Sequence, residues 1–147
     1  MNKRVNVAAL QPAAYKAMFA LEQALASGSI SPIHKELIKI RASQINGCAF
    51  CLDMHTKDAL KYGETPQRIF LLNAWKETDL FSEEEKVILA ITEEITLISH
   101  HGLTEETYAK AGSMFDEQYI AQLIMAVVTI NAWNRIAIST LAQVPKD

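Results

Sequence analysis

The sequence predicts an all-α protein, a bundle of about seven helices, on three observations. Apolar residues recur at intervals of three and four, as they do along one face of an α-helix. Only five glycines and four prolines occur, and several of them stand where helices begin or end. No alternating run of apolar and polar residues has the length of a β-strand. With 147 residues and neither an internal repeat nor a linker, residues 1–147 are expected to form one domain.

Local signals mark the ends of the predicted helices in turn. These helices cover residues 11–27, 32–46, 48–62, 66–76, 83–100, 105–113 and 117–141. Residues suited to the N-cap, followed by proline or glutamates in the first turn, are expected to start four of them: Ser31, Thr65, Ser82 and Thr104. Glycines able to adopt a left-handed backbone are expected to end two: Gly63 and Gly102.

Composition and charge argue against several classes of function. The formal net charge is -3 and no basic stripe follows a helix or loop, so we expect no nucleic-acid partner. Residues 1–7 lack the long apolar core of a secretory signal. The uncharged stretch from Tyr119 to Asn134 has 16 residues, fewer than the roughly 20 that a membrane-spanning helix needs. We therefore expect a cytoplasmic protein, not associated with a membrane, whose thiols are kept reduced.

The last predicted helix indicates self-association. From Tyr119 to Leu141 it is apolar on nearly all sides, and such a helix must be covered on several sides. A protein of this size has few other helices to supply that cover, so a homo-oligomer is expected. A central position in a monomeric bundle is the alternative.

Residues 36–55 carry the strongest chemical signal. The Asn46-Gly47 dipeptide is a strong helix breaker, so Cys48 is expected at or just inside the start of the next helix. Unpaired N–H groups and the helix dipole at a helix start favour an anion, which here is a thiolate. Cys51 follows three residues later and His55 four residues after that, so all three are predicted to share one helix face.

Paired thiols beside an imidazole are suited to peroxide reduction. Two thiols at a helix start can close a disulfide with little backbone movement, and His55 can take the proton of Cys51. The reaction needs an attacking thiolate, a proton donor and a second thiol that traps the sulfenic acid. Glu36 precedes Cys48 by twelve residues. An antiparallel hairpin would bring its carboxylate near His55, where it would orient the imidazole.

Two other interpretations of the same residues stay open. Cys48, Cys51, His55 and Glu36 together can supply four zinc ligands, which would make the protein a non-catalytic metal-binding module. Alternatively, the two cysteines are small buried residues without a chemical role. Phe50, between the cysteines, either packs in the core, shields the thiols from water or lines a substrate entrance.

The same residues resemble a known family. The chain is similar to AhpD-like alkyl hydroperoxidases, within the carboxymuconolactone decarboxylase family, from about Met18 to Leu141. Two segments carry the resemblance: Glu36-Leu-Ile-x-Ile-Arg-x-Ser-x-Ile-Asn-Gly-Cys48-x-Phe-Cys51-x-x-x-His55 and Ile130-Asn-Ala-Trp133-Asn134-Arg135. The resemblance implies an all-helical fold that assembles as trimers or hexamers.

The resemblance also implies an activity and a role for each motif residue. The protein would be an oxidoreductase that reduces small organic hydroperoxides without a bound metal, flavin or haem, and a lipoyl or similar dithiol partner would supply electrons. Cys51 would meet the peroxide, Cys48 would be its disulfide partner, and Glu36 and His55 would relay protons. The helix start by itself favours Cys48 as the thiolate, whereas His55 is the closer partner of Cys51, and here the resemblance decides for Cys51.

A comparison with two branches of the family bears on the expected activity. The best-known peroxidase branch has a second histidine between the cysteines, where this chain has Phe50, so one member of that relay is missing. The decarboxylase branch lacks the paired cysteines and acts on a cyclic lactone acid. The alternative activity is therefore carbon chemistry on a lactone or keto acid, with Glu36 and His55 as the proton-transfer groups.

Overall fold

Helices follow one another along residues 4–146, the part of the chain that the computed structural model describes, and no strand occurs there. In chain order they are α1 (Val7–Leu10), α2 (Pro12–Ala26), α3 (Pro32–Asn46), α4 (Ala49–Lys61), α5 (Pro66–Leu71), the 3₁₀ helix η1 (Leu72–Glu77), α6 (Glu83–Thr96), α7 (Glu105–Gly112) and α8 (Glu117–Thr140). The all-α prediction is confirmed. The expectation of no secretory signal concerns residues 1–7, of which 1–3 lie outside the described residues.

The structure differs from the predicted helices at three places, each for a local reason. The short helix α1 was not predicted; the side chain of Asn6 caps it by accepting a hydrogen bond from the Ala9 amide. The helix expected over 66–76 is divided, because Ala74 leaves helical geometry at φ -117° and ψ 26° within η1. The helix expected over 83–100 ends at Thr96, because Leu97 has φ -95° and ψ 40° and the chain then turns toward Gly102.

Side-chain caps start the helices that carry the fold. The Ser31 hydroxyl accepts a hydrogen bond from the His34 amide at the start of α3, and Ser82 and Glu85 form a reciprocal capping box at the start of α6. Thr65 and Thr104 cap α5 and α7 in the same way. The predicted start signals therefore act as expected.

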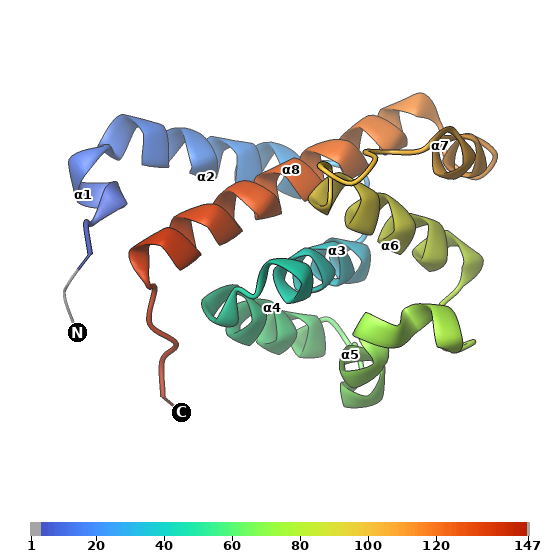
Figure 1. Cartoon of the computed structure of the whole chain (residues 1–147), viewed down its shortest axis with the longest axis horizontal. Coiled ribbons are helices and arrows are strands. Elements are labelled where there is room, and N and C mark those ends of the chain that lie inside the picture. The colour runs from blue at the N-terminus through green and yellow to red at the C-terminus, as the bar shows by residue number, and fades with distance from the viewer. Residues whose placement is uncertain (1–3, 147) are drawn as a thin grey trace.

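Helix α3 is the centre of the molecule and joins two apolar clusters (Figure 1). Its Ile38 and Ala42 pack with residues of α6, α7 and α8, whereas Leu37 and Ile40 pack with residues of α4, α5, η1 and α6. All four side chains are at most 1% exposed. Because α3 is enclosed in this way, a polar residue on it, such as Glu36, is held inside the protein.

Helix α8 is long and apolar, and it is partly enclosed by the other helices. In the described part of the chain it is the one helix with the length and composition to cross a membrane; a third of its most apolar window is buried (33%). It crosses α3 and lies beside α2 and α6 (Figure 1). Ile120, Leu123, Val127 and Ile130 of α8 are part of the core.

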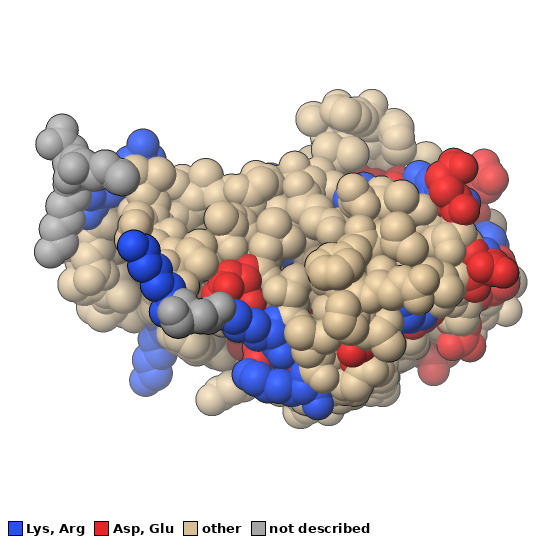
Figure 2. All heavy atoms as spheres, turned by 90° about the horizontal axis from the view of Figure 1, so that it is seen from below, with Lys and Arg blue, Asp and Glu red and all other residues tan. Residues whose placement is uncertain are grey.

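Acidic side chains gather at the end of the molecule where α6 and α7 begin (right in Figures 1 and 2). The first turn of α6 holds three glutamates, Glu83 to Glu85, and the first turn of α7 holds Glu105 and Glu106. Negative charge at a helix N-terminus interacts favourably with the helix dipole. This arrangement stabilises the start of both helices.

A partly buried ionic cluster around Glu93 ties three elements together. Its carboxylate accepts hydrogen bonds from Arg41 of α3 (2.9 Å) and from Trp75 (2.8 Å) and Lys76 (2.9 Å) of η1. Burial by itself would raise the pKa of Glu93, but these hydrogen bonds outweigh burial and hold the pKa below its usual value. The folded protein therefore favours the ionised carboxylate.

This cluster makes stability depend on acid pH. A carboxyl whose pKa is lower in the folded state stabilises the protein above its unfolded pKa of about 4.3, and that contribution is lost as pH falls through the folded pKa. We expect the free energy of unfolding in urea to fall as the pH is lowered below about 4.3, and to fall less steeply in Glu93→Gln. Parallel profiles for the two proteins would contradict the cluster's role.

Candidate active site

The connection between α3 and α4 places the two cysteines. Gly47 has φ 70° and ψ 36°, a left-handed conformation that glycine adopts without strain, and it reverses the chain after α3. Cys48 is the N-cap of α4, and its sulfur accepts a hydrogen bond from the Cys51 amide at 3.4 Å. The predicted position of Cys48 at a helix start is confirmed.

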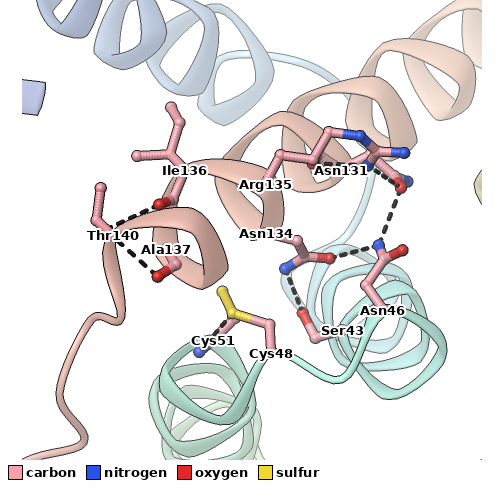
Figure 3. The surroundings of a disulfide bond; sticks show 10 residues. All are labelled: Ser43, Asn46, Cys48, Cys51, Asn131, Asn134, Arg135, Ile136, Ala137 and Thr140. Carbon is pink, nitrogen blue, oxygen red and sulfur yellow. Dashed lines mark hydrogen bonds between the residues drawn. A yellow bond between two sulfur atoms is a disulfide. The ribbon is translucent and has the colours of Figure 1, made fainter. Parts of the chain in front are cut away.

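Cys48 and Cys51 form a disulfide in this structure (Figure 3). Their Cα atoms are 5.3 Å apart, and the side chains are 1% and 2% exposed. No other cysteine is present in the sequence. The structure thus represents the oxidised state of the pair, in which neither sulfur is available as a metal ligand.

Glu36 and His55 meet inside the protein, as the hairpin argument predicted. Oε2 of Glu36 lies 2.8 Å from Nδ1 of His55, and the two residues are 5% and 6% exposed. The other carboxylate oxygen, Oε1, lies 3.7 Å from Nζ of Lys39, which stands one turn further along α3. Glu36 therefore lies between an imidazole and an ammonium group. Its contact with Lys39 was not predicted from the sequence.

A pocket of about 480 Å³ gives access to this site. Cys51 and His55 line it together with Phe50, whereas Cys48 does not. Its other walls come from α2, from Lys39 of α3 and from the last two turns of α8. The pocket thus brings a sulfur and an imidazole of α4 to one surface. Of the uses considered for Phe50, the structure supports a place on the pocket wall.

A network of buried amide side chains fixes the end of α3 against α8 (Figure 3). Asn134 donates a hydrogen bond to the Ser43 hydroxyl (2.9 Å) and accepts one from Asn46 (2.8 Å). The Asn46 amide also reaches Asn131, which bonds in turn to Thr96 at the end of α6. This network holds the turn from which Cys48 emerges. Asn131 and Asn134 are polar residues in an otherwise apolar helix, and this pattern in the sequence could have indicated the network.

We expect Asn134→Ala to destabilise the protein by about 2–3 kcal/mol. Asn134 is fully buried (0% exposed), and its removal leaves the Ser43 hydroxyl without this partner in the interior. The midpoint of urea unfolding measures the loss. Ile138→Ala, at a position on the same helix that is 40% exposed, is the control and should change stability by less than about 0.5 kcal/mol. Equal effects would show that the network does not stabilise the turn.

The four-ligand zinc set considered from the sequence is not assembled, because both sulfurs are in the disulfide. A different trio lies together in the described residues: ligand atoms of Glu36, His55 and Asp58 all fall within 4.8 Å of one another. Asp58 was not a predicted site residue, although its spacing of three from His55 places it on the same helix face. Asp58 also forms an ion pair with Lys61, in which Oδ1 of Asp58 lies 2.7 Å from Nζ of Lys61.

The sequence profile of the carboxymuconolactone decarboxylase family matches residues 12–94, more than half of the chain and the whole segment from Glu36 to His55. The chain belongs to this family. A Bacillus subtilis (strain 168) relative, the uncharacterized protein YdfG, is 45% identical over 139 residues, which make up 95% of each chain.

Solved structures place the protein among the AhpD-like members of the family. A protein of unknown function from Agrobacterium tumefaciens, named as a candidate antioxidant defence protein AhpD, is 36% identical and superposes with a TM-score of 0.94 over 99% of this chain and 100% of its own. The debrominase Bmp8 is 17% identical, with a TM-score of 0.81 over 93% of this chain and 74% of its own, which shows a shared fold alone. Membership of this family supports a peroxidase-related function for the protein.

Proposed function

We propose that this protein is a thiol-dependent peroxidase that reduces small organic hydroperoxides with the Cys48–Cys51 pair. One observation carries the proposal: Cys51 and His55 line the same pocket, and the imidazole of His55 is held by the buried Glu36 carboxylate at 2.8 Å. A nucleophile, a proton-transfer group and the residue that orients it therefore meet where a small molecule can enter.

The first step oxidises Cys51. In the reduced protein, its thiolate attacks the terminal oxygen of the hydroperoxide; an S–O bond forms, the O–O bond breaks, and the products are a sulfenic acid and an alkoxide. His55, which has taken the proton of the Cys51 thiol, gives it to the alkoxide, which leaves as the alcohol. With Glu36 ionised, its carboxylate accepts the Nδ1 hydrogen of His55, so that Nε2 exchanges protons in the pocket.

The second step closes the observed disulfide. The Cys48 thiolate, which the Cys51 amide stabilises through its hydrogen bond to the sulfur, attacks the sulfenic sulfur. An S–S bond forms, the S–O bond breaks, and hydroxide takes up a proton to leave as water. The two electrons that reduced the peroxide have then come from the cysteine pair.

Turnover requires a dithiol reductant, for which we propose a lipoyl protein or a similar dithiol. One of its thiolates would attack the disulfide, and its second thiol would resolve the mixed disulfide, which restores both cysteines. Cys51 lines the pocket and so offers the sulfur that such a partner can reach. A cytoplasmic location, where such reductants operate, stays a prediction.

A free-thiol count tests the proposed function. Reduced protein should contain two free thiols and lose both when mixed with one equivalent of cumene hydroperoxide, while its helical circular dichroism is unchanged. Retention of both thiols in a folded protein would exclude peroxidase chemistry. Protein denatured before the same treatment is the control, because thiols outside the folded site should react far more slowly.

We propose that the protein acts as a homo-oligomer, a trimer or hexamer. Helix α2 has no buried residue although it is rich in apolar side chains. Met125 and Val128 of α8 are 42% and 44% exposed. Light scattering after gel filtration should give several times the 16.4 kDa monomer mass, and Val128→Glu should reduce it. A monomeric wild-type protein at micromolar concentration would contradict this.

Two alternative functions have an observation in their favour. Glu36 and His55 form a hydrogen-bonded pair that can transfer protons without sulfur, which suits an enzyme that acts on a lactone or keto acid. Activity that survives the loss of both cysteines would favour this alternative. The trio of Glu36, His55 and Asp58 is compact enough to hold a metal ion. Stoichiometric zinc in protein purified without chelator, lost on His55→Ala substitution, would favour this second alternative.

A further inference from the structure

We infer that the pocket selects hydroperoxides that carry an uncharged aromatic ring, which Tyr15, Phe19 and Trp133 hold beside Cys51 and His55. The chemistry at the sulfur rests on the proposed function. The ring-binding site rests on separate observations and can be tested without any reaction.

Three aromatic side chains form one wall of the pocket. Tyr15 and Phe19, one turn apart on α2, have ring centroids 5.5 Å apart, and each contacts Trp133 of α8, at 5.3 and 5.4 Å. Both contacts of Tyr15 are edge-to-face, with interplanar angles of 67° and 79°. Aromatic rings favour this geometry with one another, and a further ring in the pocket can extend the same arrangement.

The wall is held in place before any ligand binds. Nε1 of Trp133 donates a hydrogen bond to Oε1 of Glu22 at 3.0 Å, which fixes the indole against α2. Aromatic side chains also have few rotatable bonds, so little conformational entropy is lost when a ligand packs on them. Helix α4 contributes Phe50 and Met54 to the same pocket, together with Cys51. A ring bound in this pocket would therefore be in the cavity that Cys51 lines.

The charges on the pocket wall favour a neutral ligand. Glu22 and Asp58 are acidic, Lys39 is the one lysine or arginine on the described wall, and His55 is hydrogen-bonded to the Glu36 carboxylate. Nζ of Lys39 is already shared by Glu22 at 3.4 Å and Glu36 at 3.7 Å. A carboxylate on the ligand would meet two acidic side chains, and both Lys39 and His55 already have acidic partners. This argues for aryl-alkyl hydroperoxides and against fatty-acid hydroperoxides.

Binding can be measured without peroxide. The probe is 2-phenyl-2-propanol, the alcohol that cumene hydroperoxide would yield, titrated calorimetrically into the protein of residues 1–147. We expect saturable binding that is at least tenfold tighter than that of tert-butanol and of the same aryl alcohol with a para-carboxylate. Equal affinity for the aryl alcohol and tert-butanol would overturn the ring site, whatever the thiols do with peroxides.

Kinetics give a second, independent readout. The ratio of kcat/KM for cumene hydroperoxide to that for tert-butyl hydroperoxide should fall about three- to tenfold in Phe19→Ala. Phe19 is 53% exposed, so this variant should fold normally. Phe70→Ala, which removes an exposed ring on α5 outside the pocket, should leave the ratio unchanged.

The outcomes separate the two proposals. If both hydroperoxides oxidise the thiols with equal kcat/KM and Phe19→Ala leaves the ratio unchanged, the ring site is wrong and the peroxidase stands. If the aryl alcohol binds with the expected selectivity but no hydroperoxide oxidises the thiols, the peroxidase is wrong and the ring site stands.

Discussion

Replacing Cys51 with serine is expected to abolish hydroperoxide reduction, down to the rate of the peroxide in buffer. Cys51 is the cysteine that lines the pocket beside His55, and a serine hydroxyl cannot form the sulfenic acid on which the cycle depends. Peroxide consumption by reduced protein, followed with the variant and the wild type at equal concentration, measures the effect.

Cys48→Ser is the matched variant, and it should behave differently. It retains the attacking thiol, so it should consume one equivalent of hydroperoxide and stop at a sulfenic acid that dimedone traps and mass spectrometry detects. The structure supports this order because the Cys48 sulfur faces the first turn of α4 and is not on the pocket wall. If instead Cys51→Ser forms the sulfenic acid and Cys48→Ser does not, the two roles are reversed.

Substitution of His55 is expected to have the second largest effect. Loss of a positioned proton donor typically lowers a rate by about 10²–10⁴-fold, so His55→Gln should slow oxidation of the thiols by at least about 100-fold. Glu36→Gln, which keeps a hydrogen-bonding group beside His55 but removes its charge, should slow it less. Stopped-flow measurement of thiol oxidation gives both rates.

Stability must be followed in the same variants. Glu36 and His55 are buried and hydrogen-bonded to each other, and removing one partner of a buried hydrogen bond can cost about 1–3 kcal/mol. Rates should therefore be compared at a temperature at which circular dichroism shows each variant folded. A folded His55→Gln protein that reacts at the wild-type rate would exclude His55 from the proton relay.

Much of the fold could be predicted from sequence because the helix ends carry local signals. Ser31 with Pro32, and Ser82 with Glu85, act within one helical turn, so their effect depends little on the rest of the molecule. The predicted proximity of Glu36 and His55 followed from two helices and one short turn. In contrast, the kink at Ala74 carries no local signal of this kind.

The pocket could not be predicted, because its walls come from segments far apart in the sequence. Tyr15 and Phe19 precede Trp133 by more than a hundred residues, and their contact depends on how α2 lies along α8. The same is true of the bonds from Asn134 to Ser43 and Asn46. Periodicity shows which face of a helix is apolar but not which other helix covers it.

The central claim is that the two cysteines supply the electrons that reduce a hydroperoxide, and the stoichiometry of a single turnover tests it most directly. Reduced protein is mixed with less than one equivalent of cumene hydroperoxide. The alcohol formed is quantified, and the mass of the peptide that contains Cys48 and Cys51 is measured by mass spectrometry. We expect one molecule of alcohol for each 48–51 disulfide formed. Alcohol formed while both thiols remain, or a disulfide formed without alcohol, would contradict the account.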